Sequence, residues 1–320
     1  MFIIEVRNWL FCLLFGSGWH MFRAKHKKTI GITLMMLPGA IWIIILRYVP
    51  MGGIVMAFQN YRPHPPNPTL FRNIINSDFI GIDNFRFIFA SDRAWNMIRN
   101  TIGYNAVFIV LTLVLSIALA VALNEITKPK LAKAYQTLMF FPFFISWVVA
   151  SYFVFAFLAP HFGVFSELRN WYHDPGPWPF ILTGAHLWKN LGFNCIVYFA
   201  AIRGIDQEQY EAAAIDGASR WRQVWAITIP GIKPMIIIMF IMAVGRIFNA
   251  DFGLFWNVPN NMGPLMGVTE VFDTYVFRAM QSMTVGMSTA AGLFQSFIGF
   301  LFIMLANGIV RRVDNENALF

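Results

Sequence analysis

Long runs of apolar residues constrain this chain more than any other feature. A helix needs about 20 mostly apolar residues to cross a bilayer, and we identify six candidate runs, at residues 29–49, 101–123, 137–158, 180–202, 234–249 and 289–309. Charged residues make up 12% of the chain, against about 25% in soluble proteins. We therefore predict an all-α integral membrane protein with six transmembrane helices.

The basic residues lie mainly at the ends of these runs, which sets an expected orientation. Lys128, Lys130 and Lys133 follow the second run, and Arg311 and Arg312 follow the sixth. By the positive-inside rule, the N and C termini then both lie in the cytoplasm. This topology accounts for the net charge of +8, so we expect membrane lipid and no nucleic acid as a partner.

Two short flanks are expected beside a transmembrane domain at residues 29–312. Residues 1–28 form an N-terminal cytoplasmic segment. Within it, an interfacial helix over 1–20 is favoured over a signal peptide, because Glu5 interrupts the first apolar turns. Residues 313–320 form a cytoplasmic tail.

A polar segment at residues 206–231 interrupts the apolar runs between the fourth and the fifth. Asp206 predicts a helix start, and Gly217 predicts a turn because glycine tolerates a left-handed backbone. Ser219 predicts the cap of a second helix, which runs to about residue 229 and ends at Pro230. We call this helix–turn–helix unit the bracket; its apolar residues are Tyr210, Ile215, Trp221 and Trp225.

The bracket carries the most specific motif in the chain. Its sequence EAAAIDGASRWRQVWAITIP resembles the EAA motif of permease subunits of binding-protein-dependent ABC importers, with Ile229 where leucine commonly precedes the proline. The stretches LPGAIWIIILRYVPMGG, GIDNFRFIF and DTYVFRAM resemble the oligosaccharide subgroup, which includes aldouronate- and alginate-type transporters. The positions that match the EAA motif are Glu211, Ala212, Ala213, Asp216, Gly217, Ala218, Ile227 and Pro230.

This resemblance implies a type I ABC importer permease in the bacterial inner membrane, and not an enzyme. It implies that the bracket is the coupling helix, which docks in a groove of a separate ATPase subunit. Glu211 would then either anchor to the ATPase by charge or brace the bracket internally. The implied partners are two ATPase subunits that use ATP and Mg, a second permease subunit (expected to be a different chain), an extracytoplasmic solute-binding protein and an oligosaccharide. No cofactor is expected on this chain itself.

Polar residues inside the runs are candidates for a substrate pathway. Lys189 and Arg246 either line a cavity for sugar hydroxyls or carboxylates, or pair with a carbonyl or reach an interface. Arg246 is expected about two thirds of the way through its span. Trp188, Asn194 and Asn249 are weaker candidates, because in a chain rich in aromatics a tryptophan is more often a packing residue.

Other classes of function find less support. The histidines form no zinc-binding pair, and no phosphate-binding loop or nucleophile elbow occurs, so an enzyme lacks a candidate site. No metal is implied by Cys12 and Cys195, which we expect to be free, buried thiols. The main alternative, an ion-coupled secondary transporter, is expected to show midspan acidic residues and repeated halves, and the predicted spans show neither.

Overall fold

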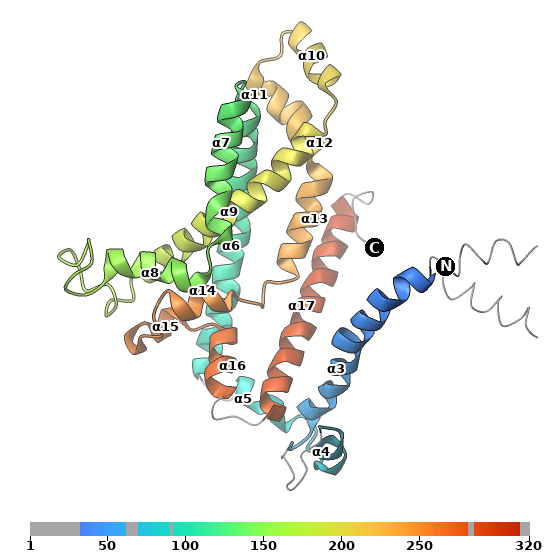
Figure 1. Cartoon of the computed structure of the whole chain (residues 1–320), viewed down its shortest axis with the longest axis vertical. Helices are drawn as coiled ribbons and strands as arrows, with labels where there is room; N and C mark the ends of the chain where they lie inside the picture. The colour runs from blue at the N-terminus through green and yellow to red at the C-terminus, as the bar shows by residue number, and fades with distance from the viewer. Residues whose placement is uncertain (1–32, 62–69, 90–91, 281–284, 314–320) are drawn as a thin grey trace, which may run out of the picture. The chain divides into compact units, whose positions relative to one another are not determined.

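The computed structural model describes residues 33–61, 70–89, 92–280 and 285–313, and these residues are largely helical (Figure 1). The chain divides into two compact units, Met1–Val55 and Met56–Phe320. The predicted interfacial helix, Cys12 and the residues after 313 lie outside the described residues.

The first predicted span is a helix that continues past Pro50 to Phe58, rather than closing at residue 49. It contains η1 (Ile44–Tyr48), α3 (Val49–Met51) and η2 (Gly52–Phe58). Proline lacks an N–H and its ring crowds the carbonyl four residues back. The π-helical turn η1, in which the Val49 N–H bonds to the Ile44 carbonyl, widens the helix just before Pro50 and lets it continue.

The second unit contains the remaining elements. In chain order they are α4 (Leu70–Asn76), η3 (Asp83–Phe85), α5 (Arg86–Phe89), α6 (Asp92–Asn124), α7 (Pro129–Phe140), η4 (Phe141–Phe144), α8 (Trp147–Leu158), α9 (Trp178–Arg203), α10 (Gln207–Ile215), α11 (Arg220–Gln223), η5 (Val224–Thr228), α12 (Ile229–Gly231), α13 (Lys233–Val244), α14 (Phe252–Asn257), η6 (Gly263–Leu265), α15 (Met266–Thr269), α16 (Phe272–Met280) and α17 (Val285–Val313).

Three helices of the described chain are long and apolar enough to cross a membrane: Thr33–Phe58, Trp95–Asn124 and Val285–Arg312. The number rises to five if each of two bent helix pairs counts as one span. α9, at the predicted fourth span, is 26 residues long, but polar residues such as Lys189 and Asn190 make it less apolar than these helices.

The predicted third span, residues 137–158, is two helices rather than one. The segment Pro129–Phe144 and the helix Trp147–Leu158 meet at 99°. Pro142 lies in the 3-10 turn η4, and Ile145 is extended, so the regular hydrogen-bond ladder ends there. Ser146 starts α8 afresh by accepting a hydrogen bond from the Val149 N–H at 3.3 Å.

The core of the second unit lies around α6 and α9, which pack along each other. One apolar cluster surrounds Trp178 and Leu254, and a second surrounds Phe272. A third contains Tyr198 and the buried thiol of Cys195, which is free as predicted. This third cluster lies at the junction of α9 with the bracket.

Candidate functional site

The bracket begins with a capped helix and turns at a glycine, as predicted. The Asp206 carboxylate accepts a hydrogen bond from the Glu208 N–H at 3.1 Å and caps α10. Gly217 has a left-handed φ of 76°, which most side chains would strain. The Ala218 N–H then bonds back to the Ala213 carbonyl at 2.9 Å, and so satisfies a carbonyl at the helix end.

The second arm of the bracket returns from this turn toward the core. The Ser219 hydroxyl accepts a hydrogen bond from the Arg222 N–H at 3.4 Å and caps α11, as predicted. The arm stays helical through η5 and α12, and ends at Gly231. A bend of 60° separates it from α13.

Side-chain contacts join the two arms. The Tyr210 hydroxyl lies 2.9 Å from Oγ1 of Thr228, and Nε2 of Gln223 donates to the Ala218 carbonyl at 3.1 Å. Thr228 and Gln223 are buried. The first contact joins the two arms and the second ties the second arm to the turn, so the bracket is a single folded piece rather than a loose loop.

The base of the bracket is packed into the core. Ile232 is a buried member of the cluster around Tyr198, and Ile205 packs against the same cluster. A Cβ added to Gly231 would meet the Ile205 side chain at 2.6 Å, so the two ends of the bracket touch. The base of the bracket therefore packs where α9 ends and α13 begins.

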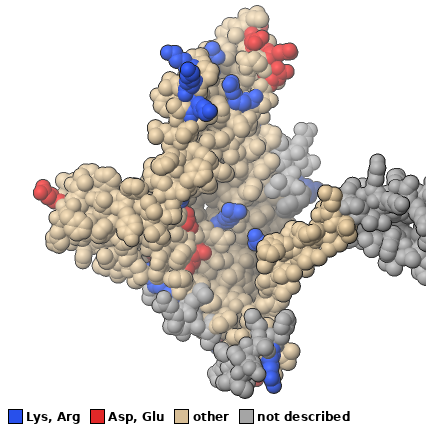
Figure 2. Space-filling view, in the orientation of Figure 1, with Lys and Arg blue, Asp and Glu red and all other residues tan. Residues whose placement is uncertain are grey.

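The outer surface of the bracket exposes three large apolar side chains: Ile215, Trp221 and Trp225 are 87%, 72% and 69% exposed. Figure 2 shows acidic side chains gathered over α10 and basic ones beside them, over α7 and α11. We call this the charged end, formed by the bracket and the α6–α7 turn. Exposed large apolar side chains beside charged ones are typical of a surface that binds another protein.

The eight residues that match the EAA motif are divided between exposed and half-buried positions. The Glu211 carboxylate is exposed and has neither an ion pair nor a hydrogen bond within the described chain. This geometry favours contact with another subunit over internal bracing. Exposed positions are Glu211, Ala212, Asp216, Gly217 and Pro230; half-buried positions are Ala213, Ala218 and Ile227.

Lys189 binds the backbone at the break between α7 and α8. Its ammonium group donates to the carbonyls of Phe143 at 2.9 Å and Pro142 at 3.5 Å, and also to that of Ile145. It also lies over the rings of Phe143 and Trp147, with 5.8 and 5.5 Å to the centroids. Of the two alternatives for Lys189, the geometry favours pairing with carbonyls over lining a cavity.

Trp188 and Asn194 occupy different environments on α9. The Trp188 side chain is 46% exposed. The Asn194 amide donates to the Asn190 carbonyl at 2.9 Å, one turn back on the same helix. Asn194 therefore uses a donor within α9, whereas Trp188 presents an aromatic surface outward.

Arg246 and Asn249 lie beyond the helix in which they were expected. α13 ends at Val244, so the predicted place of Arg246 two thirds of the way through its span is wrong. Both side chains are exposed, and the Asn249 N–H bonds to the Arg246 carbonyl at 2.8 Å. Side chains from other helices bind the carbonyls of the segment that follows: Asn105 donates to Ile247 at 2.9 Å and Gln295 to Phe248 at 3.2 Å.

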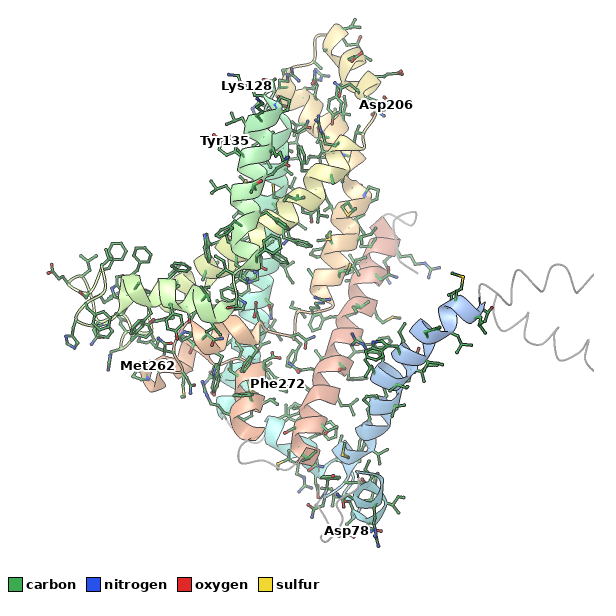
Figure 3. All side chains as sticks on the ribbon, in the orientation of Figure 1. Asp78, Lys128, Tyr135, Asp206, Met262 and Phe272 are labelled. Atoms are coloured by element: carbon green, nitrogen blue, oxygen red, sulfur yellow. The ribbon has the colours of Figure 1, made fainter. Side chains whose placement is uncertain are left out.

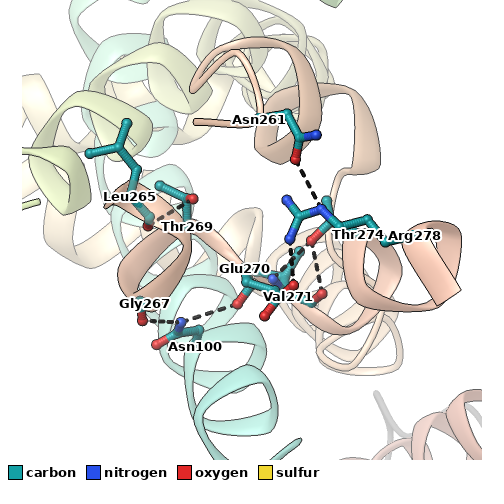
Figure 4. Close-up of polar contacts among 9 residues, drawn as sticks. All are labelled: Asn100, Asn261, Leu265, Gly267, Thr269, Glu270, Val271, Thr274 and Arg278. Atoms are coloured by element: carbon teal, nitrogen blue, oxygen red, sulfur yellow. Dashed lines mark hydrogen bonds and ion pairs between the residues drawn. The ribbon is translucent and has the colours of Figure 1, made fainter. Parts of the chain in front are cut away.

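A polar network between α14 and α16 was not predicted (Figure 4). Arg278 Nη1 and Glu270 Oε1 form an ion pair at 2.5 Å, with side chains 19% and 5% exposed. Arg278 Nε donates to Asn261 Oδ1 at 2.9 Å, and the guanidinium lies 5.4 Å from the centroid of the Trp256 ring. The sequence did contain a signal for this ion pair. Arg278 is the only Lys or Arg between residues 247 and 310, and an isolated charge in apolar surroundings needs a partner.

The chain offers no arrangement for metal binding where it is described: no group of three His, Cys, Asp or Glu side chains lies close enough to hold an ion.

Comparison with known proteins identifies a family. A family model described as "Binding-protein-dependent transport system inner membrane component" matches residues 113–315. LplB of Bacillus subtilis is 31% identical over 318 residues, covering 94% of each chain. A polygalacturonan/rhamnogalacturonan transport system permease, YteP of the same organism, is 33% identical over 301 residues and covers 88% of each chain.

Solved structures agree with this match. A chain of a bacterial ABC transporter involved in the import of the acidic polysaccharide alginate superposes with a TM-score of 0.80 at 29% identity. The match covers 92% of the present chain and all of that chain. The same kind of transporter in complex with an alginate pentasaccharide-bound periplasmic protein gives a TM-score of 0.78 at 29% identity, covering 91% and 97% of the two chains.

Proposed function

The chain belongs to the family of binding-protein-dependent transport system inner membrane components, and we propose that it forms the pathway of an ATP-driven importer for acidic oligosaccharides. The relatives support this substrate class, since one transports polygalacturonan or rhamnogalacturonan and another takes part in alginate import. The chain itself performs no ATP chemistry in this proposal.

The observation that carries the proposal is the exposed surface of the bracket. Ile215, Trp221 and Trp225 project from a rigid, capped element, and Glu211 has no partner within the described chain. Such a surface suits a groove on another protein. In the proposed complex that protein is an ATPase subunit, which uses ATP and Mg.

The proposed complex has two ATPase subunits, this chain, a second permease subunit of different sequence and an extracytoplasmic solute-binding protein. The charged end faces the cytoplasm, as its lysines and arginines favour, and both termini lie on that side. Closure of the two ATPases pushes on the bracket. Because its ends pack against Ile205 and Ile232, the movement passes to α9 and α13 and opens or closes the pathway.

Within the pathway, we assign substrate contacts to Arg246, Asn249 and Trp188. Arg246 is exposed at the break after α13, where its guanidinium is available to a sugar carboxylate. Asn249 and Trp188 supply an amide and an aromatic face. Lys189 stays with the backbone of the α7–α8 break and acts there as a positioning residue.

The experiment that tests this function is reconstitution of the complex in proteoliposomes with its binding protein loaded with uronate oligosaccharide. We expect loaded binding protein to stimulate ATP hydrolysis and uptake. Glu211→Lys lowers both without affecting membrane insertion, whereas Glu167→Lys, an equal charge change outside the charged end, leaves them unchanged. Hydrolysis that does not respond to loaded binding protein contradicts the proposed function.

A further inference from the structure

The outward face of α7 and the first residue of η4 form a shallow, open groove that the transport cycle described above does not use. It has a volume of about 560 Å³ and is lined by Lys130, Lys133, Ala134, Thr137, Leu138 and Phe141. These positions recur at three- and four-residue spacing, so they share one helix face. From the helical rise, the groove runs about 16 Å along the helix, from two ammonium groups to two apolar side chains.

The opposite face of α7 is already occupied. A Cβ added to Gly192 of α9 would overlap the Met139 carbonyl, so the backbones of the two helices are in direct contact. In contrast, Leu138 and Phe141 in the groove are 70% and 62% exposed. In a membrane, the groove face has to be covered by lipid or by another subunit.

The charge in the groove distinguishes between these two occupants. No carboxylate lines the groove, and neither Lys130 nor Lys133 has an ion pair within the described chain. The Thr137 hydroxyl donates to the Lys133 carbonyl at 2.9 Å, which leaves the two ammonium groups as the donors that face outward. Two ammonium groups above an apolar channel match a phosphate headgroup above an acyl chain.

The position along α7 agrees with this match. Figure 3 shows Lys128 at the start of α7, at the charged end, and Tyr135 further along the helix, pointing away from the neighbouring helices. An exposed tyrosine just below a group of lysines is typical of the membrane–water interface. The headgroup depth of a bilayer therefore coincides with the lysines of the groove.

We propose that this groove binds one anionic phospholipid, with its phosphate at Lys130 and Lys133 and an acyl chain along Leu138 and Phe141. A covering protein subunit would have to bring carboxylates to two exposed ammonium groups. The phosphate of an anionic lipid, in contrast, already lies at the headgroup depth of the bilayer. The bound lipid covers the outer face of the first half of the broken helix pair.

The first test counts bound lipid by native mass spectrometry of the assembled complex, after exchange into phosphatidylglycerol or phosphatidylcholine. We expect retained phosphatidylglycerol on the unaltered complex. The double variant Lys130→Gln/Lys133→Gln lowers the preference for phosphatidylglycerol over phosphatidylcholine about 25-fold, because each lost charge lowers it roughly fivefold. Arg311→Gln/Arg312→Gln removes two charges from the end of α17 and serves as the matched control. Equal lipid retention in both double variants overturns the proposal.

The second test places a photoreactive amino acid at Leu138, in the assembled complex in a bilayer that contains phosphatidylglycerol. We expect a mass increase of one phosphatidylglycerol molecule, which is lost when Lys130 and Lys133 are changed to glutamine. A cross-link to a second permease subunit overturns the lipid assignment and identifies a subunit interface. A phosphatidylcholine adduct in the same yield from a mixed bilayer overturns it as well, because the groove then does not select charge.

Discussion

The phenolic oxygen of Tyr210 lies 2.9 Å from Oγ1 of Thr228, in a hydrogen bond that joins the first arm of the bracket to the second. Thr228 is only 3% exposed, so its hydroxyl has little access to water. In the proposed complex, this contact and the capped helix ends hold the two arms together so that movement of the bracket passes to the core.

Tyr210→Phe removes this hydrogen bond while keeping the ring. An unsatisfied buried hydroxyl costs about 1–3 kcal/mol, and we expect that cost to appear as local loosening of the bracket. The amount of oligosaccharide transported per ATP hydrolysed falls in proteoliposomes, while the amount of inserted protein stays the same. Tyr152→Phe, at a 68% exposed tyrosine on α8, is the control. An unchanged transport ratio in Tyr210→Phe shows that the cross-arm contact is dispensable.

Gly217→Val tests the turn of the bracket. The space around Gly217 is open, but its φ of 76° costs a β-branched residue about 1–2 kcal/mol of backbone strain. We expect ATP hydrolysis to become uncoupled from uptake with insertion intact. Gly217→Asn keeps most of the coupling, because asparagine tolerates this backbone region. Full uptake by the valine variant contradicts the assignment of Gly217 to coupling.

Arg278→Met tests the network between α14 and α16. Breaking a buried ion pair by removing one partner typically costs about 3–5 kcal/mol, so thermal unfolding of the purified complex shifts to lower temperature. The double variant Glu270→Leu/Arg278→Met recovers part of this loss, because no charge is then buried alone. If the double variant is no more stable than Arg278→Met, the ion pair is not the main role of these residues.

Arg246→Ala tests the pathway. Because the guanidinium is exposed beside the break after α13, its loss weakens uptake of uronate oligosaccharides by about tenfold, the effect of one charge-assisted contact of about 1.5 kcal/mol. Uptake of a neutral oligosaccharide of the same length, measured with the same vesicles, changes much less. An equal fall for both sugars assigns Arg246 to packing.

The bracket was largely predictable from sequence because its signals are local. Asp206 and Ser219 cap helices within three residues of their own positions, and Gly217 turns the chain by its own backbone freedom. The family resemblance rested on the same segment, and the matching family covers residues 113–315. The contacts of this segment with other subunits belong to the proposed complex.

The helix breaks were less predictable because distant residues stabilise them. Lys189 holds the α7–α8 break from 46 positions further along the chain, and Asn105 satisfies a carbonyl after α13 from 142 positions away. Hydropathy treats both breaks as parts of continuous spans. Arg246 was therefore placed inside a helix, although the helix ends two residues earlier.

The most direct test of the account is a photoreactive amino acid at Ile215, the most exposed of the bracket's large apolar side chains at 87%. In the assembled complex, we predict an ultraviolet-dependent cross-link between Ile215 and the ATPase subunit, whose yield changes when ATP is bound. The same reagent at Tyr152 on α8 gives no ATPase cross-link. Cross-links from Ile215 to lipid alone, with an ATPase subunit present in the complex, would contradict the claim that the bracket is the site of coupling.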